Sequence, residues 1–282
     1  MRPGVEKPAE FVEALAKGLA ILESFDAAHP EMTLSEVARS VGLSPAAARR
    51  SLITLSALGY VGRTGKRFHP KPKVMTLGST FYFSARIDEL LQPDLKALVE
   101  RFGDASSVGT LSDHDVIYVA HYSVQRAHRV MAVIGARYPA YATSIGRVVL
   151  AAQPPDALDA YLARLAPEPL TAKTLTDPCA LREEIGRVRE NGYATTVDQL
   201  DYGITALAVP VRNSQGVTVA ALNSSGYSGV VTPESLVAER LPELRAAAAR
   251  ITRKMARFPI LESMLGPQLD FLQRNRGHVQ TV

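Results

Sequence analysis

The chain has 282 residues, of which 46% are hydrophobic and 21% charged, a composition typical of a globular protein long enough for two domains. The single cysteine, Cys179, excludes an internal disulfide and a cage of thiolates around a metal. No apolar run approaches the roughly 18 to 20 residues that span a bilayer, and the first residues do not resemble a signal peptide, so we expect a cytoplasmic protein with no membrane partner.

Positive charge is concentrated towards the amino terminus. Residues 1–86 contain 12 basic and 7 acidic side chains, whereas the rest of the chain contains 20 and 21. Nine Lys or Arg residues and no Asp or Glu lie between Val37 and Ile87. A merely solvated helical face normally mixes both signs. The excess therefore favours binding to the phosphates of nucleic acid, which weakens as salt rises.

The same region has the pattern of a helix-turn-helix. Apolar residues at three- and four-residue spacing predict a first helix over 11–25. Thr33 and Glu36 form the capping box of a second helix, which ends at a glycine. Ser44 caps a third helix, predicted over 45–58. Two helices joined by a short turn that contains glycine are typical of a DNA-binding motif.

We predict that the third helix enters the major groove. Ala48, Leu52 and Leu55 share its core face, whereas small residues and two adjacent arginines lie outside. Small residues let the backbone approach the groove, and arginine reaches guanine edges or phosphates. A basic hairpin around Thr64-Gly65 then forms a wing. The predicted DNA-binding residues are Ser44, Ala46, Ala47, Arg49, Arg50 and Thr54 on the helix, and Arg63, Lys66 and Arg67 on the wing.

A connector helix and a second domain follow. The helix is predicted over 74–86, and its apolar face packs either on its own head or on the same helix of a second subunit. Further helices are predicted over 90–102, 144–151, 155–165, 179–191 and 233–258, and strands over 106–111, 116–122, 129–134, 193–197, 205–211 and 217–223. Hairpin strands interleaved with helices predict an α+β domain built on an antiparallel sheet.

Several segments together resemble the IclR family of bacterial transcription regulators. In the head they are Thr33-Leu-Ser-Glu-Val-Ala, Gly42-Leu-Ser-Pro-Ala-Ala and Leu55-Ser-Ala-Leu-Gly-Tyr. In the second domain they are Gly135-Ala-Arg-Tyr-Pro-Ala-Tyr-Ala-Thr-Ser-Ile-Gly-Arg147, Asp198-Gln-Leu-Asp-Tyr-Gly203, Ala208-Val-Pro-Val211 and Ala220-Ala-Leu-Asn-Ser-Ser-Gly226. The resemblance spans roughly residues 12–258. Its form is similar to the branch that controls protocatechuate, 4-hydroxybenzoate and β-ketoadipate catabolism.

The resemblance implies a domain organisation and partners. It implies an α+β protein with a winged helix-turn-helix domain over 1–72, a linker helix over 73–87, a GAF-like effector-binding domain over 88–260 and a C-terminal tail over 261–282. Such regulators assemble as homodimers or dimers of dimers on near-palindromic double-stranded DNA.

The resemblance also implies a small carboxylate effector, an aromatic acid or an intermediate of aromatic breakdown. Free main-chain N–H groups at the start of a helix hold an anion without a cation. The implied effector-binding residues are Thr143, Ser144, Ile145, Gly146, Asp198, Asn223 and Ser225. Arg137 and Tyr141 are further candidates, with either a ligand contact or a structural role. Ala206 and Asn223 depart from the family pattern, so the pocket differs from those of its relatives.

Patterns typical of enzymes are incomplete. His114, His121 and His128 recur every seven residues, an odd step that turns neighbours to opposite faces of a strand, so we interpret them as surface or turn histidines rather than metal ligands. The glycine-rich stretch before Lys66 lacks the spacing of a phosphate loop, and no G-x-S-x-G elbow occurs. We therefore predict a regulator that is not an enzyme and has no metal or cofactor.

One alternative remains open at this point. The second domain of a DNA-binding oligomer can serve only to assemble the complex and sense nothing. A ligand-sized cavity bordered by Ser144, Asp198 and Ser225 would distinguish a sensor from this alternative.

Overall fold

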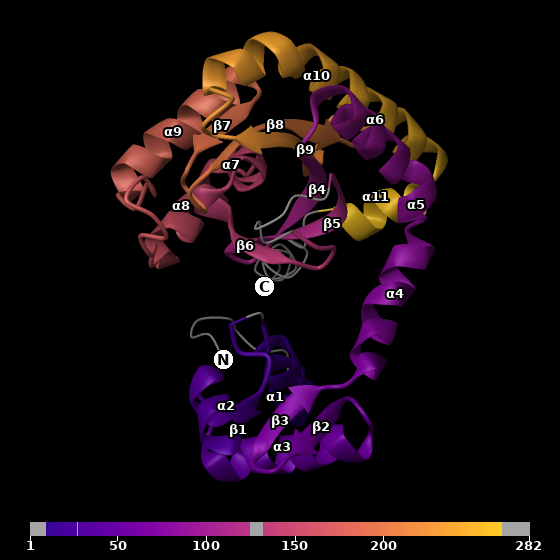
Figure 1. Ribbon diagram of the computed structural model, residues 1–282, viewed down its shortest axis with the longest axis vertical. Helices are drawn as coiled ribbons and strands as arrows, with labels where there is room; N and C mark the ends of the chain where they lie inside the picture. The colour runs from indigo at the N-terminus through magenta and orange to yellow at the C-terminus, as the bar shows by residue number, and fades with distance from the viewer. Residues whose placement is uncertain (1–9, 27, 125–131, 267–282) are drawn as a thin grey trace, which may run out of the picture. The chain divides into compact units, whose positions relative to one another are not determined.

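The computed structural model describes residues 10–26, 28–124 and 132–266, and the chain divides into two compact units between Phe81 and Tyr82 (Figure 1). The first unit contains α1 (Glu13–Glu23), β1 (Met32–Thr33), α2 (Leu34–Ser40), α3 (Pro45–Ala57), β2 (Val61–Thr64), β3 (Arg67–Pro70) and the short helix η1 (Pro72–Val74). Helix α4 (Met75–Ser84) begins in the first unit and ends in the second.

The predicted helix-turn-helix is confirmed, together with its caps. Thr33 Oγ1 accepts from the Glu36 N–H at 3.4 Å, and Glu36 Oε2 accepts from the Thr33 N–H at 2.7 Å. Gly42 separates α2 from α3 with φ +64°, a conformation that glycine adopts without steric cost. Ser44 Oγ then caps α3 by accepting from the Ala47 N–H. These local bonds fix the angle at which α3 follows α2.

The wing differs from its prediction in two details. Its turn lies at Gly65 and Lys66, because Thr64 pairs with Arg67 across the hairpin. Strand β1, which was not predicted from the sequence, pairs with β3 to give a three-stranded sheet in the order β1-β3-β2. Met32 of β1 is buried in the core of this unit. Two residues are too short a run for period-two patterning to reveal.

The second unit is a six-stranded antiparallel sheet with helices on both faces. Its elements are α5 (Ile87–Leu90), α6 (Gln92–Phe102), β4 (Ala105–Ser112), β5 (Asp115–Ser123), β6 (Arg137–Pro139), η2 (Ala140–Ala142), α7 (Ser144–Ala151), α8 (Pro155–Arg164), α9 (Pro178–Asn191), β7 (Ala194–Val197), β8 (Ile204–Arg212), β9 (Thr218–Tyr227), α10 (Pro233–Arg257) and α11 (Pro259–Leu265). The strand order is β6-β5-β4-β9-β8-β7. The α+β class predicted from the sequence is confirmed.

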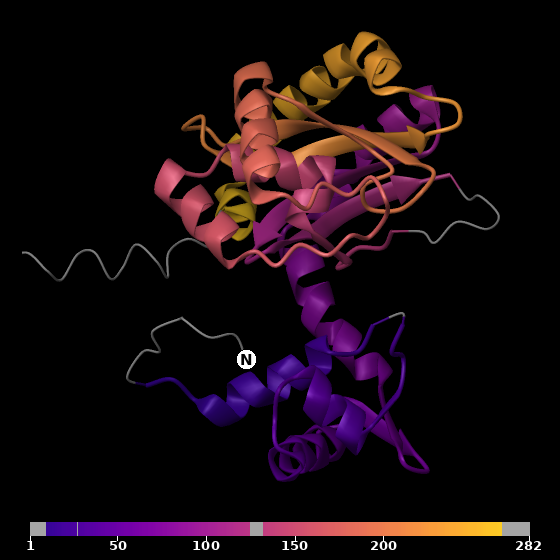
Figure 2. The same cartoon turned by 90° about the vertical axis from the view of Figure 1, so that its left-hand side faces the viewer.

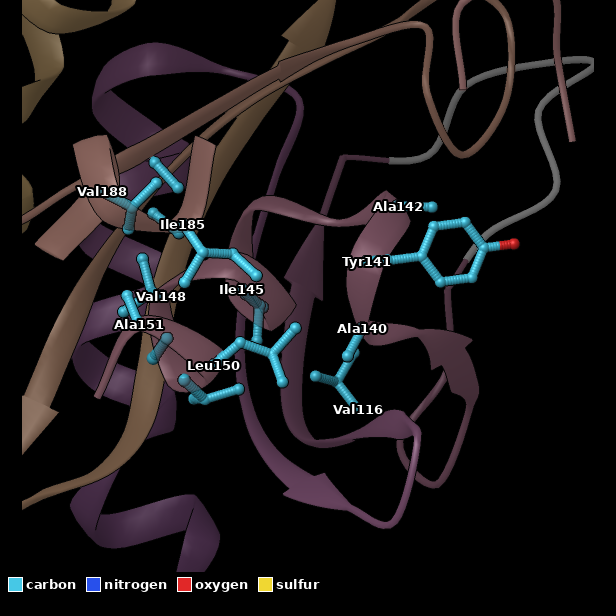
Figure 3. Packing of buried hydrophobic residues seen from close by; sticks show 14 of the residues in the cluster. Val116, Ala140, Tyr141, Ala142, Ile145, Val148, Leu150, Ala151, Ile185 and Val188 are labelled. Atoms are coloured by element: carbon cyan, nitrogen blue, oxygen red, sulfur yellow. The ribbon is translucent and has the colours of Figure 1, made fainter. Parts of the chain in front are cut away.

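The two faces of this sheet carry different helices. Helices α6 and α10 cover one face, and α7 packs on the other beside α9 (Figures 1 and 2). Ile145, Val148 and Leu150 of α7 form a buried apolar cluster with residues of α9 and η2 (Figure 3). Gly109 of β4 lies below α7, and a Cβ there would stand 3.0 Å from Ile145 Cγ2. The missing side chain therefore allows α7 to approach the sheet closely.

Three segments differ from the sequence-based expectation. Residues 132–134 are not a strand, residues 129–131 lie outside the described part of the chain, and β6 begins only at Arg137. The helix expected over 90–102 is α6, which begins at Gln92, and a short helix that was not predicted, α5, precedes it. Residues 259–265, part of which we assigned to a tail, form α11, in which Leu261 and Leu265 are fully buried. The packed unit therefore extends at least to Leu265.

No helix within the described ranges has the length and apolar character needed to cross a membrane.

Candidate functional site

The first candidate site is the outer face of α3. Ser44, Ala46, Arg49, Arg50 and Thr54 are exposed and Ala47 is half-buried, whereas Leu52 and Leu55 on the opposite side are buried. Within the described ranges, the side chains of Arg49 and Arg50 make no hydrogen bond or ion pair. Both guanidinium groups are therefore available to an external partner, as direct readout of a base edge requires.

The wing contributes cations of unequal availability. Arg67 forms ion pairs with Glu31 at 3.5 Å and Glu36 at 3.7 Å, and its Nη1 donates to the Glu31 carbonyl. Arg63 donates to the Gly65 carbonyl and stacks on Phe68, although it stays exposed. Lys66 at the tip is exposed and has no bond to any residue that the structure describes. Of the three predicted phosphate contacts, Lys66 is thus the most available, and Arg67 already stabilises the wing against α2.

The second candidate site is a cavity of about 350 Å³ between the sheet and the start of α7. Two rows of paired strand residues form its floor. One row runs from Thr196 through Ala206, Ser225 and Ala105 to Ser123, and the other contains Asn223, Ser107 and His121. On β4, β5 and β9 the members of the two rows are two residues apart, so their side chains face the same side of the sheet. The floor is rich in neutral hydrogen-bonding groups.

The roof of the cavity is the N-terminus of α7. Thr143 caps this helix by accepting from the Gly146 N–H at 2.9 Å, which leaves the N–H groups of Ser144 and Ile145 without a partner among the described residues. Ser144 is 1% exposed, lines the cavity, and its hydroxyl also lacks a partner there. Three donors and the positive end of a helix dipole thus lie at the start of α7, an arrangement that suits a carboxylate.

Four of the predicted effector residues line the cavity, namely Thr143, Ser144, Asn223 and Ser225. Asn223 Oδ1 accepts from the Ser107 N–H at 2.8 Å, so its amide group remains as a donor. Ile145 and Gly146 do not line the cavity, since the Ile145 side chain is fully buried in the core and the Gly146 N–H donates to Thr143 Oγ1.

Arg137 and Tyr141 have structural contacts and do not line the cavity. Arg137 Nη2 lies 3.0 Å from Asp115 Oδ2 on the neighbouring strand. The Tyr141 hydroxyl donates to the Glu168 carbonyl at 2.9 Å and accepts from the Glu168 N–H at 3.0 Å. Burial raises the pKa of this phenol, which therefore stays neutral. Of the two roles left open by the sequence, these contacts favour the structural one.

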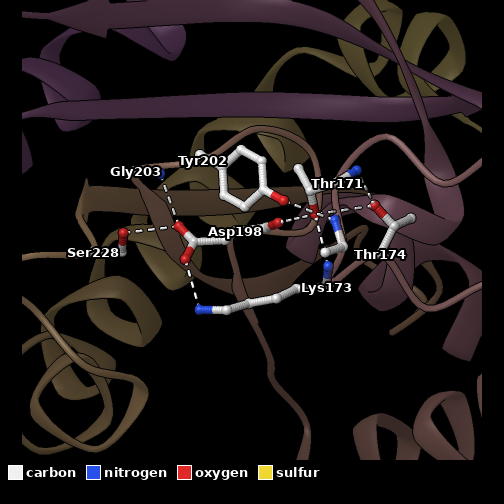
Figure 4. A network of polar contacts seen from close by, with 8 residues as sticks. Thr171, Lys173, Thr174, Asp198, Tyr202, Gly203 and Ser228 are labelled. Carbon is white, nitrogen blue, oxygen red and sulfur yellow. Dashed lines mark hydrogen bonds and ion pairs between the residues drawn. The ribbon is translucent and has the colours of Figure 1, made fainter.

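Asp198 also lies outside the cavity lining, where it holds a loop in place (Figure 4). Its carboxylate accepts from Lys173 Nζ, the Gly203 N–H and Ser228 Oγ, each at 2.8 Å. Its carbonyl accepts from Thr171 Oγ1. Residues 200 and 201 of the same loop border the cavity. The structure thus gives Asp198 an indirect role, as a residue that positions this loop.

A conservative substitution tests the network of Asp198. The hydrogen bond from Lys173 and those from Ser228 and Gly203 lower the pKa of Asp198 below its ordinary value. Its charge therefore stabilises the fold above the unfolded-state pKa of about 4, and that contribution disappears as the pH falls through the lower folded pKa. Asn tolerates the positive φ of 51° at this position. We expect Asp198→Asn to lose less than about 1 kcal/mol at neutral pH, because the Lys173 partner is exposed.

Urea unfolding of both proteins at neutral pH and near pH 3 measures this loss. The difference should shrink at the acidic pH, and in a double-mutant cycle with Lys173→Met the two effects should not add. A difference that is equal at both pH values contradicts the pairing.

Arg147 is a buried residue that the sequence analysis did not assign. It is 2% exposed, donates to the Tyr141 carbonyl at 3.0 Å and to Gln199 Oε1, and lies 3.8 Å from Glu184. Burial lowers its pKa to about 10, so it remains charged at neutral pH. It thereby joins α7 to α9, η2 and the loop held by Asp198.

Two wall residues were also missed. Tyr118 and His121 of β5 both line the cavity, although an odd interval separates them. The register of β4 and β5 shifts between Val108 and Gly109, which leaves Val119 unpaired and turns Tyr118 to the face of His121. His121, interpreted from the sequence as a surface or turn histidine, is therefore part of the cavity wall. His128 lies outside the described residues.

Comparison with known proteins finds relatives of both units. The IclR helix-turn-helix domain family matches residues 14–65, and the family described as bacterial transcriptional regulator IclR, C-terminal, matches residues 82–253. The Pca regulon regulatory protein of Pseudomonas putida is 34% identical over 247 residues, which cover 87% of this chain and 85% of that protein.

Solved structures give the same result. A putative transcriptional regulator from Rhodococcus sp. RHA1 is 40% identical with a TM-score of 0.71, over 88% of this chain and 99% of that one. The inducer-binding domain of PobR from Acinetobacter, a double mutant in complex with 3-hydroxybenzoic acid, is 33% identical with a TM-score of 0.53, over 57% of this chain and 94% of that one. With the winged helix-turn-helix and the α+β domain already described, the matched ranges show that the chain belongs to the IclR family of bacterial transcriptional regulators.

Proposed function

We propose that this regulator binds a small aromatic monocarboxylate in the cavity below α7, and that binding changes its affinity for an operator. The observation that carries the proposal is the set of donors without a described partner at the start of α7, namely the Ser144 and Ile145 N–H groups and the Ser144 hydroxyl, next to a cavity that Ser144 lines. The names of the Pseudomonas and Acinetobacter relatives, a Pca regulator and an inducer-binding domain with a hydroxybenzoic acid, support the same ligand class.

The cavity walls favour an aromatic ring. Tyr118 and Tyr138 meet edge to face, with ring centroids 4.9 Å apart, and both line the cavity. Leu200, Ile204 and Ala206 add apolar surface. A mostly apolar cavity of this volume with a few polar groups is typical of a small-molecule site. Ser144 and Ser225 border the cavity, whereas Asp198 does not. The presence of a ligand-sized cavity at this place favours a domain that senses a ligand over one that only assembles the complex.

In this proposal the DNA partner is a near-palindromic duplex read by a homodimer, or by a dimer of such dimers. Arg49 and Arg50 of each subunit enter a major groove, and the wing contacts phosphates. Helix α4 supplies apolar surface for assembly, since Met75, Leu77 and Phe83 are 75%, 51% and 73% exposed. The protein works in the cytoplasm with the chromosome, catalyses no reaction and needs no cofactor.

A thermal-shift screen tests the effector. Benzoate, the hydroxybenzoates and protocatechuate at about 100 times their Kd should stabilise the native state by about 2.7 kcal/mol, which is roughly 5–10 °C for a domain of this size. 4-Hydroxybenzamide, which has the shape of 4-hydroxybenzoate without the charge, should stabilise much less. If no acid of the panel shifts the melting temperature while duplex binding is intact, the assembly-only alternative replaces the proposal.

A further inference from the structure

His121 lines the cavity, and of its two ring nitrogens Nδ1 has a hydrogen-bond partner among the described residues whereas Nε2 has none. Its Nδ1 lies 2.9 Å from Ser107 Oγ. Ser107 is itself fixed, because its N–H donates to Asn223 Oδ1 and it pairs with His121 across the sheet. The backbone of His121 is fixed as well, since its carbonyl accepts from Gln92 Nε2 at 3.2 Å. The ring therefore has a defined place in the wall.

The other nitrogen, Nε2, is buried and has no hydrogen-bond partner among the described residues. A buried polar atom without a partner costs free energy, which a ligand group at this position recovers. The same cost discriminates against a ligand that lacks such a group. His121 thus has the arrangement of a group that reads a substituent of the ligand.

The substituent that suits this position is uncharged. Burial lowers the pKa of His121, so the ring is neutral near pH 7. No Lys or Arg occurs among the described residues that line the cavity, whereas Asp104 and Asp201 do. A second carboxylate would bring a further negative charge into a wall to which the described residues contribute no cation. A hydroxyl both donates and accepts, and therefore bonds to Nε2 in either tautomer of the neutral ring.

We propose that His121, oriented by Ser107, is a specificity-determining residue that bonds through Nε2 to a hydroxyl of the effector and so selects hydroxylated monocarboxylates over unsubstituted acids and dicarboxylates. This inference rests on the proposed effector function. The carboxylate occupies the start of α7, and His121 reads the other substituent.

Side-chain length supplies a matched pair of variants. His121→Asn keeps a polar group near Ser107 but has none at the position of Nε2, whereas His121→Gln reaches that position. Calorimetric titration of each protein with benzoate, the three hydroxybenzoate isomers and adipate gives the preference, defined as the Kd of benzoate divided by that of the tightest isomer. We expect a preference of about tenfold or more in the wild type, near one in His121→Asn and several-fold in His121→Gln.

Benzoate affinity is the internal control for folding, because it reports the α7 site and should change less than about threefold. Ser107→Ala keeps the imidazole of His121 but removes the hydroxyl that bonds to its Nδ1, and should therefore reduce the preference partially. If His121→Asn does not fold, Ser107→Ala takes its place in the test. The inference is overturned if the wild type has no preference, if the preference survives in His121→Asn, or if adipate binds more tightly than any hydroxybenzoate. If the wild type binds none of these acids, the proposed function itself fails as well.

Discussion

Replacing Gly146 with alanine should displace the start of α7, destabilise the second unit and abolish effector binding. A Cβ on Gly146 would lie 2.0 Å from the carbonyl oxygen and 2.4 Å from the Cα of Ala140. Both are backbone atoms of η2, so no side-chain rotation relieves the clash. Overpacking that a core can relax costs about 1–3 kcal/mol, and we expect at least about 3 kcal/mol where only backbone can move.

Gly186 is the matched control for this substitution. It also lies inside a helix, α9, but nothing stands within 4 Å of a Cβ placed there. Gly186→Ala should therefore stabilise the chain by about 0.5–1 kcal/mol, the ordinary helix preference for alanine over glycine. Urea unfolding followed by circular dichroism measures both changes, and titration with the benzoate panel measures binding. If Gly146→Ala unfolds at the same urea concentration as the wild type, the close packing of α7 on η2 is incorrect.

Elements that depend on local sequence were predictable. The side chains of Thr33, Ser44 and Thr143 each accept from a backbone N–H three residues further on, and α2, α3 and α7 begin directly after these caps. Asn223 and Ser225 are two residues apart and share one face of β9, although the strand predicted over 217–223 ended before Ser225.

Features that depend on distant partners were not predictable. The unpaired residue at Val119 arises from the register between β4 and β5, and it decides that Tyr118 faces the cavity. Asp198 resembles a ligand residue in the sequence, but a lysine 25 positions away and a serine 30 positions away occupy its carboxylate. Which distant polar side chains will bond to a given carboxylate depends on the folded arrangement of the chain, and local sequence patterns do not encode it.

Replacing both Arg49 and Arg50 with alanine should weaken specific DNA binding by a factor on the order of 10² to 10⁴. Each arginine that contacts a base edge contributes about 1–3 kcal/mol, and both side chains are exposed on α3. Fluorescence anisotropy with a duplex that the wild-type protein selects from a randomised pool measures the loss. The salt dependence of Kd then separates base contacts from phosphate contacts, since each lost phosphate contact reduces the slope by about 0.9.

Arg253→Ala with Arg257→Ala removes the same two charges from exposed positions of α10 in the other unit. If charge alone governed binding, the two double variants would lose affinity equally, because both lower the net charge of +4 by two. If α3 contacts the bases, only the double variant at Arg49 and Arg50 should change the sequence preference. The double variant at Arg253 and Arg257 should change the affinity for DNA slightly, and only at low salt. Equal losses for the two pairs would remove α3 from the interface.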